Sequence, residues 1–392
     1  MTSPGGPAEV RRVTVLAGDG VGPEVTAQAE LVLARACRHW GVDAVFEHRH
    51  IGGIAIDEEG APLPDATLDA CRSSDAVLLG AVGGPRWDHL QGELRCEAGL
   101  LRLRKELELF ANLRPVRVHP ALAARTPLKE EVVASADLVV VRELTGGIYF
   151  GQPRGRSGSG PDETAIDTMV YTRAEVERIV RFAFQLAATR RGRLVSVDKA
   201  NVLMTSRLWR DTVNDVATDF PEVHLEHQLV DSCAMRLVRA PRDFDVLVME
   251  NLFGDILSDE AAVLAGSLGM LPSASLGHGG PGVYEPVHGS APEIAGKDEA
   301  NPLGAILSAA MCLRLSLGLP GAAAAVEAAV DAVIDEGTVT AELGGSAGTR
   351  QVGQAVLEAL DRAAAQAVTS GSSGDSSSPA APTEAPAHAT LS

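Results

Sequence analysis

An α/β fold with a mainly parallel sheet is predicted by this sequence of 392 residues, because short β-branched runs alternate with longer amphipathic segments. A chain of this length accommodates two domains or one large α/β unit. With 45% hydrophobic residues it can bury a substantial core. The expected strands are 13–17, 76–79, 138–141, 194–197 and 246–249, and the expected helices include 24–40, 173–190 and 203–218.

Four other segments depart from this alternation. Residues 145–172 are rich in glycine and proline with isolated aromatic residues, which predicts an extended arm or hairpin that projects from the body. Residues 271–296 are also rich in glycine and proline and are long enough to form a functional loop. The apolar stretch 302–320 contains Arg314 and is bounded by prolines, so it favours a buried helix over a membrane span. From 364 to 392 large apolar residues are almost absent, which predicts a disordered tail.

The formal net charge of −18 argues against a nucleic-acid partner or an anionic membrane surface, since either would need a basic face. It leaves room for small anionic substrates, which need only a local group of arginines. The five cysteines are far apart and show no C-x-x-C or Cys/His ligand spacing. This pattern is typical of reduced thiols in a cytoplasmic protein. Residues 1–12 lack the apolar core of a signal peptide.

Asp255 and Asp259 are the most informative pair of side chains. Their spacing of four places both carboxylates on one face of a helix, about one turn apart. Apolar or small residues lie between them, with no Lys or Arg to neutralise the pair, and facing carboxylates suit a hard divalent cation such as Mg²⁺ or Mn²⁺. Because the acidic run continues to Glu260, a solvated helix face is the alternative.

Gly18, Gly20 and Gly22 follow the first expected strand and open a helix. They look like a dinucleotide-binding turn, but the third glycine of G-x-G-x-x-G is missing and no well-placed acid closes the second strand. A tight strand-to-helix turn that borders an active cleft fits this spacing better.

Arg142 ends a fully apolar strand, where an unpaired guanidinium is costly, so we expect it to bind an anion. Arg104 shares a helix face with Leu100, and the two would suit a ligand with an apolar branch and a carboxylate. Taken alone, Arg104 fits a solvated helix residue better than a binding residue. Arg114 precedes Pro115, which favours extended backbone.

Two further segments hold candidate residues. Lys199 follows an apolar strand, at the edge where α/β active sites collect, and Tyr149 lies in the glycine-rich segment. His288 and Glu293 lie in a turn-rich segment that could wrap a nucleotide, with Glu293 accepting hydrogen bonds from a ribose diol. Each of these residues could instead be structural, and the segment could be ordinary surface.

In this order and spacing, the segments resemble the β-decarboxylating dehydrogenases of the isocitrate/isopropylmalate dehydrogenase family. The similarity extends from 13 to about 360 and is carried by 18–25, 141–151, 196–202, 251–259 and 344–348, among others. It implies two α/β domains around a twisted mixed sheet, not a Rossmann fold, and it replaces the dinucleotide interpretation of the glycine turn. The implied first domain, on the cofactor side, comprises 1–109 and 266–363, and the second comprises 110–265 with the dimer interface and the arm.

The resemblance also implies a homodimer with shared active sites. Arg104, Arg114 and Arg142 would hold the substrate carboxylates by charge-assisted bonds. Lys199 of the partner subunit would help to remove the hydroxyl proton, and Tyr149 would supply a proton after CO₂ leaves. The residues expected around the substrate are Glu97, Leu100, Leu101, Arg104, Arg114, Arg142, Val202 and Asp231.

The metal and the cofactor follow from the same resemblance. One Mg²⁺ or Mn²⁺ per subunit would be bound by Asp255 and Asp259 together with Asp231 of the partner subunit. NAD is the expected cofactor, because an acid at 293 repels the 2′-phosphate of NADP. Family members usually carry the shorter Asp there, and Glu293 should still reach the ribose diol. The expected cofactor-binding residues are His288, Gly289, Ser290, Ala291, Pro292, Glu293 and Asn301.

Leu100 and Leu101 decide the expected substrate. They would leave the third carboxylate of isocitrate buried and unpaired, which favours an apolar branch. The implied reaction is therefore NAD-dependent oxidative decarboxylation of (2R,3S)-3-isopropylmalate to 4-methyl-2-oxopentanoate and CO₂, in leucine biosynthesis. Oxidation of D-malate or tartrate is the alternative. A non-catalytic scaffold or an anion-binding protein would not need Lys199, Tyr149 and the acidic triad together.

Overall fold

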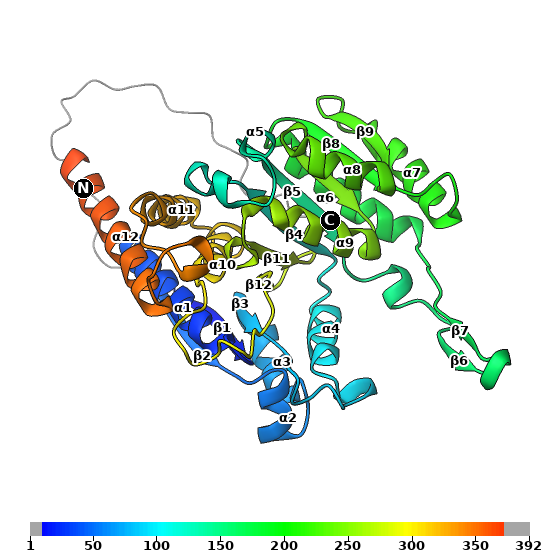
Figure 1. Ribbon diagram of the computed structural model, residues 1–392, viewed down its shortest axis with the longest axis horizontal. Helices are drawn as coiled ribbons and strands as arrows, with labels where there is room; N and C mark the ends of the chain where they lie inside the picture. Colours follow the sequence, from blue (N-terminus) through cyan, green and yellow to red (C-terminus); the bar gives the residue numbers. More distant parts are fainter. Residues whose placement is uncertain (1–9, 372–392) are drawn as a thin grey trace.

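The structure is a computed structural model that describes residues 10–371. A ten-stranded sheet in the order β2-β1-β3-β12-β11-β4-β5-β10-β8-β9 runs through the molecule, with helices on both of its faces (Figure 1). Three pairings in its middle are antiparallel: β12 with β11, β11 with β4, and β4 with β5. The remaining pairings are parallel, so the predicted α/β class is confirmed and the sheet is mixed.

The two ends of the chain build one half of this sheet and the middle of the chain builds the other. The first half contains β1 (Val10–Gly18), β2 (Asp43–His48), β3 (Ala76–Ala81), β11 (Pro272–Leu276) and β12 (Gly282–Pro286). The second contains β4 (Ala111–Arg117), β5 (Asp137–Glu143), β8 (Arg193–Asp198), β9 (His224–Leu229) and β10 (Val246–Met249). The five strands expected from the sequence lie within β1, β3, β5, β8 and β10, whose apolar runs are buried by helices on both faces.

Helices cover the sheet as the amphipathic segments predicted. They are α1 (Gly22–His39), α2 (Gly53–Glu59), α3 (Asp65–Arg72), α4 (Cys96–Glu106), α5 (Glu130–Val133), α6 (Arg173–Ala188), α7 (Met204–Ala217), α8 (Val230–Arg239), α9 (Asn251–Ala262), α10 (Leu303–Leu315), α11 (Pro320–Asp335) and α12 (Thr349–Gly371). The buried helix expected within 302–320 is α10, which packs against α1, α11 and the first half of the sheet. Among the described helices, none is long and apolar enough to cross a membrane.

Two expectations about the second half of the chain are wrong. Residues 271–296 are not one long loop, because β11 and β12 occupy 272–276 and 282–286 and pair with each other. The tail does not begin at 364, because α12 continues to Gly371. The rest of that prediction, 372–392, lies outside the described residues.

The glycine-rich segment forms the expected hairpin. Strands β6 (Gly155–Ser157) and β7 (Thr164–Ile166) pair antiparallel in a small sheet of their own, and every residue in them is exposed. Figure 1 shows this hairpin extending away from the body at the lower right, below α7. A two-stranded sheet with no buried face has little stability alone.

Replacing Leu360 with alanine should lower the free energy of unfolding by about 2–5 kcal/mol, because Leu360 is fully buried where α12 packs on α1 and α11. Urea unfolding followed by circular dichroism measures the change. Glu358→Ala is the control, since Glu358 is exposed on the same helix. Equal midpoints for the two variants would contradict the packing of α12 seen here.

Candidate active site

Helix α9 carries the acidic pair and begins directly after β10. Glu250 caps it, with its side chain accepting hydrogen bonds from the backbone N–H groups of Leu252 and Phe253 at 2.9 and 3.0 Å. Asp255 and Asp259 then follow one turn apart, as their spacing predicted.

The neighbouring strands place two arginines beneath this pair. Arg142, at the end of β5 and only 5% exposed, donates from Nε and Nη2 to Asn251 Oδ1 at 3.2 and 2.9 Å and pairs through Nη1 with Asp255. Arg114 in β4 donates from Nη1 to Asp259 Oδ1 at 2.8 Å. Burial lowers the pKa of Arg142 to about 10, against the opposing effect of Asp255, so it stays charged at neutral pH. The strand-end guanidinium is therefore paired with a carboxylate of α9, and its role in binding substrate stays a prediction.

Gly254 explains why α9 can approach the sheet so closely. A Cβ atom at this position would lie 2.4 Å from Cγ of Arg142, well inside van der Waals contact. The glycine thus lets the helix lie directly over the stem of Arg142, and the guanidinium emerges beside Asp255.

Tyr149 completes a cluster with Arg142 and Asp255. It ends a short 3₁₀ turn, Gly147–Tyr149, that follows β5. Its hydroxyl donates to Asp255 Oδ2 at 2.7 Å, and its ring centroid lies 5.8 Å from the Arg142 guanidinium carbon. The pKa of Tyr149 is raised to about 12, mainly by burial and next by the hydrogen bond to Asp255. The phenol therefore keeps its proton at neutral pH and donates it in a hydrogen bond to Asp255.

Arg104 on α4 approaches from the other half of the sheet. Its Nη2 donates to Glu285 Oε1 at 2.6 Å, whereas its Nε is buried with no hydrogen-bond partner among the described residues. An unsatisfied buried donor costs about 1–3 kcal/mol, which an anionic ligand would recover. Leu100 and Leu101 lie partly buried one turn before it, and Glu97 is exposed at the start of the helix.

Lys199 and Asp231 form a separate group. Lys199 follows β8, Asp231 lies in the first turn of α8, and Lys199 Nζ donates to Asp231 Oδ1 at 2.6 Å. This hydrogen bond lowers the pKa of Asp231. Between residues 10 and 371, no three acidic, histidine or cysteine side chains converge on a metal position within one chain. The triad of Asp231, Asp255 and Asp259 thus stays a prediction that needs a second subunit.

Buried polar atoms mark the expected cofactor segment. His288 Nδ1 hydrogen-bonds the carbonyl of Gly289 at 2.8 Å, while His288 Nε2 is buried with no partner in the described chain. Asn301 Nδ2 is buried and unpartnered in the same way. Burial lowers the pKa of His288, which favours a neutral ring with Nε2 as an acceptor. A donor and an acceptor left without partners fit a polar ligand such as a nucleoside, and Glu293 lies exposed in the same segment.

The glycine turn supports this segment. Val21 N donates to Ser290 O at 2.8 Å, and a Cβ at Gly20 would lie 1.9 Å from the same oxygen. The buried Asp19 accepts hydrogen bonds from the backbone of Gly53 and Gly83, both at 2.7 Å. These contacts give the turn a structural role, which accounts for its glycines without a dinucleotide fingerprint.

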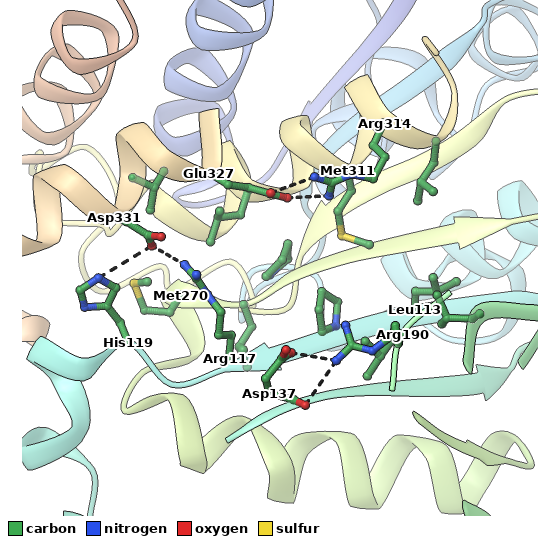
Figure 2. A pocket seen from close by; sticks show the side chains of 18 of the residues that line it. Leu113, Arg117, His119, Asp137, Arg190, Met270, Met311, Arg314, Glu327 and Asp331 are labelled. Carbon is green, nitrogen blue, oxygen red and sulfur yellow. Dashed lines mark hydrogen bonds and ion pairs between the residues drawn. The ribbon is translucent and has the colours of Figure 1, made fainter. Parts of the chain in front are cut away.

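A cavity of about 370 Å³ lies elsewhere, beneath α10 and α11 (Figure 2). Leu113 and Val139 line it. Arg114 follows Leu113, and Arg142 follows Val139, by an odd number of residues, so the two arginine side chains project from the opposite face of the sheet. Its charged side chains are already paired, as Arg117 with Asp331, Arg190 with Asp137, and Arg314 with Glu327. This cavity is therefore not where the catalytic candidates meet.

Comparisons with known proteins identify the family of this chain. The sequence matches the isocitrate/isopropylmalate dehydrogenase family over residues 12–356. The chain belongs to this family. It is 59% identical over 337 residues to a 3-isopropylmalate dehydrogenase of Geobacillus kaustophilus, covering 86% of this chain and 91% of that protein. It is 56% identical over 354 residues to one of Halalkalibacterium halodurans, covering 89% and 98%.

Solved structures of the isocitrate/isopropylmalate dehydrogenase family have the same fold. An isocitrate dehydrogenase from Methylococcus capsulatus superposes with a TM-score of 0.79 at 36% identity, covering 89% of this chain and 99% of that one. A beta-decarboxylating dehydrogenase from Thermococcus kodakarensis has a TM-score of 0.75 at 36% identity, covering 94% and 100%. All the candidate site residues lie within the span that matches the family.

Proposed function

We propose that this protein catalyses the NAD-dependent oxidative decarboxylation of (2R,3S)-3-isopropylmalate to 4-methyl-2-oxopentanoate and CO₂, a step of leucine biosynthesis, in the cytoplasm. The observation that carries the proposal is the cluster of Arg142, Tyr149 and Asp255, where a guanidinium, a phenol and a carboxylate meet. In the proposed reaction, these groups would bind a substrate carboxylate, supply a proton and bind the metal. The two leucines before Arg104 add an apolar surface for the isopropyl branch.

A homodimer would complete the metal site. On α8, Asp231 shares a helix face with Met235 and Val238, which are 68% and 42% exposed. On α9 and the turn that continues it, Asp259 shares a face with Ile256 and Val263, which are 57% and 47% exposed. Exposed apolar residues on two neighbouring helices are typical of an interface. Burying these faces against a second copy would bring Asp231 of the partner subunit toward Asp255 and Asp259.

The donor set fits a hard cation, because three carboxylates supply the oxygen ligands that Mg²⁺ and Mn²⁺ prefer. When bound, the cation would polarise the substrate hydroxyl and carboxylate, and NAD would accept the hydride. Arg104, Arg114 and Arg142 would orient the substrate through its two carboxylates.

Two side chains would then move protons. Lys199 of the partner subunit would help to remove the hydroxyl proton as hydride leaves carbon 2, which gives a ketone next to carbon 3, the carbon that carries the second carboxylate. The bond from carbon 3 to that carboxylate then breaks, CO₂ leaves, and the electron pair stays on the product. Tyr149, protonated because its pKa is raised to about 12, would give its proton to carbon 3.

The direct test is NADH formation with DL-3-isopropylmalate, Mn²⁺ and K⁺, with and without a chelator. The same assay with D-malate and isocitrate compares the substrates, and NADP in place of NAD tests the role assigned to Glu293. Turnover of 3-isopropylmalate that a chelator abolishes supports the proposal. A preference for D-malate or isocitrate would overturn the substrate assignment.

Replacing Leu100 with serine and Leu101 with asparagine should reduce the preference for 3-isopropylmalate over D-malate by roughly 1–3 kcal/mol for each apolar side chain that no longer meets the isopropyl branch. The ratio of the two kcat/KM values measures this preference. Leu315→Ser is the matched control, because Leu315 is an exposed leucine on α10, away from the cluster. An unchanged ratio in the double variant would place the isopropyl branch elsewhere.

A further inference from the structure

Tyr171 lies between the two segments that carry the catalytic cluster, although no reaction step uses it. Its ring is 7% exposed and packs on the turn before Tyr149, since Cβ atoms at Gly146 and Gly147 would lie 2.7 and 2.5 Å from its atoms. Gly147 N also donates to the carbonyl of Val170 at 3.0 Å. The segment that leads into α6 therefore supports the turn that presents Tyr149.

The Tyr171 hydroxyl lies between two buried carboxylates. Its oxygen is 3.3 Å from Glu143 Oε2 and 3.4 Å from Glu250 Oε2. Each carboxylate holds a different backbone segment: Glu143 accepts from the N–H groups of Thr145 and Gly146, both at 2.8 Å, and Glu250 caps α9. A single phenol thus ties the loop after β5 to the start of α9.

The hydroxyl also acts as an acceptor. Asn251 N donates to it at 3.0 Å, and Asn251 Nδ2 donates to the carbonyl of Gly146 at 3.1 Å. Asn251 Oδ1 in turn receives both hydrogen bonds from Arg142. Burial raises the pKa of Tyr171 far above its usual range, so the phenol remains a neutral donor and acceptor. Asn251 therefore connects this hydroxyl directly to the guanidinium expected to bind substrate.

We propose that Tyr171 and Asn251 are positioning residues. They hold the Arg142 guanidinium in place to bind substrate, and they fix the position of the Tyr149 turn relative to α9. This inference rests on the proposed function, because it assigns Arg142 and Tyr149 to substrate. Groups that orient a substrate- or metal-binding side chain through hydrogen bonds influence activity without touching the reacting atoms. The pair is uncharged and buried, so it acts through geometry alone.

The test is Tyr171→Phe, which removes the hydroxyl and keeps the ring that packs on Gly146 and Gly147. We expect kcat/KM for 3-isopropylmalate to fall about 10- to 100-fold, mainly through KM, with KM for NAD unchanged. Tyr284→Phe is the matched control: Tyr284 is also fully buried, and its hydroxyl bonds Ser316 at 2.7 Å, away from the cluster. If Tyr171 had a purely structural role, both variants would have a lower melting temperature, and their KM values for 3-isopropylmalate would be the same.

A double-variant comparison tests the assumed connection. If Tyr171 acts through Asn251, then Asn251→Ala combined with Tyr171→Phe should be no worse than Asn251→Ala alone. Additive effects, or kinetics for Tyr171→Phe that match those of Tyr284→Phe, would overturn the inference. Failure of the wild-type protein to oxidise 3-isopropylmalate would instead overturn the proposed function. The same variants would then be compared on D-malate or isocitrate, whichever the wild type oxidises.

Discussion

Replacing Asp255 with asparagine is expected to lower kcat by about 100-fold or more while the protein stays folded, since a metal ligand contributes several kcal/mol to the transition state. Asparagine keeps the volume and the hydrogen-bond acceptor that Tyr149 uses, but it removes the charge that faces Arg142. Steady-state kinetics at saturating Mg²⁺, with circular dichroism and gel filtration as folding checks, measure the effect. Asp215→Asn is the control, because the Asp215 side chain forms an exposed ion pair with Arg173.

The same variant can test whether active sites are shared. Lys199→Ala should also be inactive, because Lys199 is proposed to help remove the hydroxyl proton. In a mixed dimer of the two variants, one site would contain both defects and the other would contain neither. Random pairing should then restore about a quarter of the wild-type activity. If both residues served a site within one chain, every site in the mixture would keep one defect and no activity would return.

Replacing Tyr149 with phenylalanine should reduce kcat by about 10²- to 10⁴-fold, the usual contribution of a positioned general acid. KM for 3-isopropylmalate should change little, because the ring and Arg142 remain in place. Since the pKa of Tyr149 is raised to about 12, the wild-type enzyme should lose no activity through its ionisation between about pH 7 and pH 10. A variant with near-normal kcat across this range would show that another group supplies the proton.

Strands made of a continuous apolar run could be predicted from the sequence, whereas strands that contain polar, charged, glycine or proline residues could not. Strand β10 coincides with its predicted range because all four residues, Val246–Met249, are apolar and buried. Strand β9 is largely polar, and β4 contains both Arg114 and Pro115. Their strand conformation depends on pairing with β8, β5 and β11, residues that are remote in the sequence.

Site residues marked by a local sequence pattern could be recognised from the sequence, whereas those defined by long-range contacts could not. Asp255 and Asp259 could be recognised because a spacing of four is local, and Arg142 could because a charge ending an apolar strand is unusual. Asn251 and Tyr171 are uncharged and lie 80 positions apart, so no local pattern reveals that their atoms touch. Asn251 carried one signal, its place at the start of a helix next to a capping acid. A hydrogen-bond network between uncharged groups that are far apart in the sequence can be recognised only from the three-dimensional structure.

The division of the sheet between chain ends and chain middle sets an order of events during synthesis. Strand β3 pairs with β12, and α1 packs against α10 and α12, so the first 106 residues cannot complete their core until the last helices exist. At about 5–20 residues per second, that wait lasts roughly 10–50 s. Residues 111–262, by contrast, contain β4, β5, β8, β9 and β10 with α6 to α9 in one continuous stretch. We therefore expect the middle of the chain to fold first on the ribosome. Strand β11 would then pair with the free edge of β4, and the two ends of the chain would fold together there.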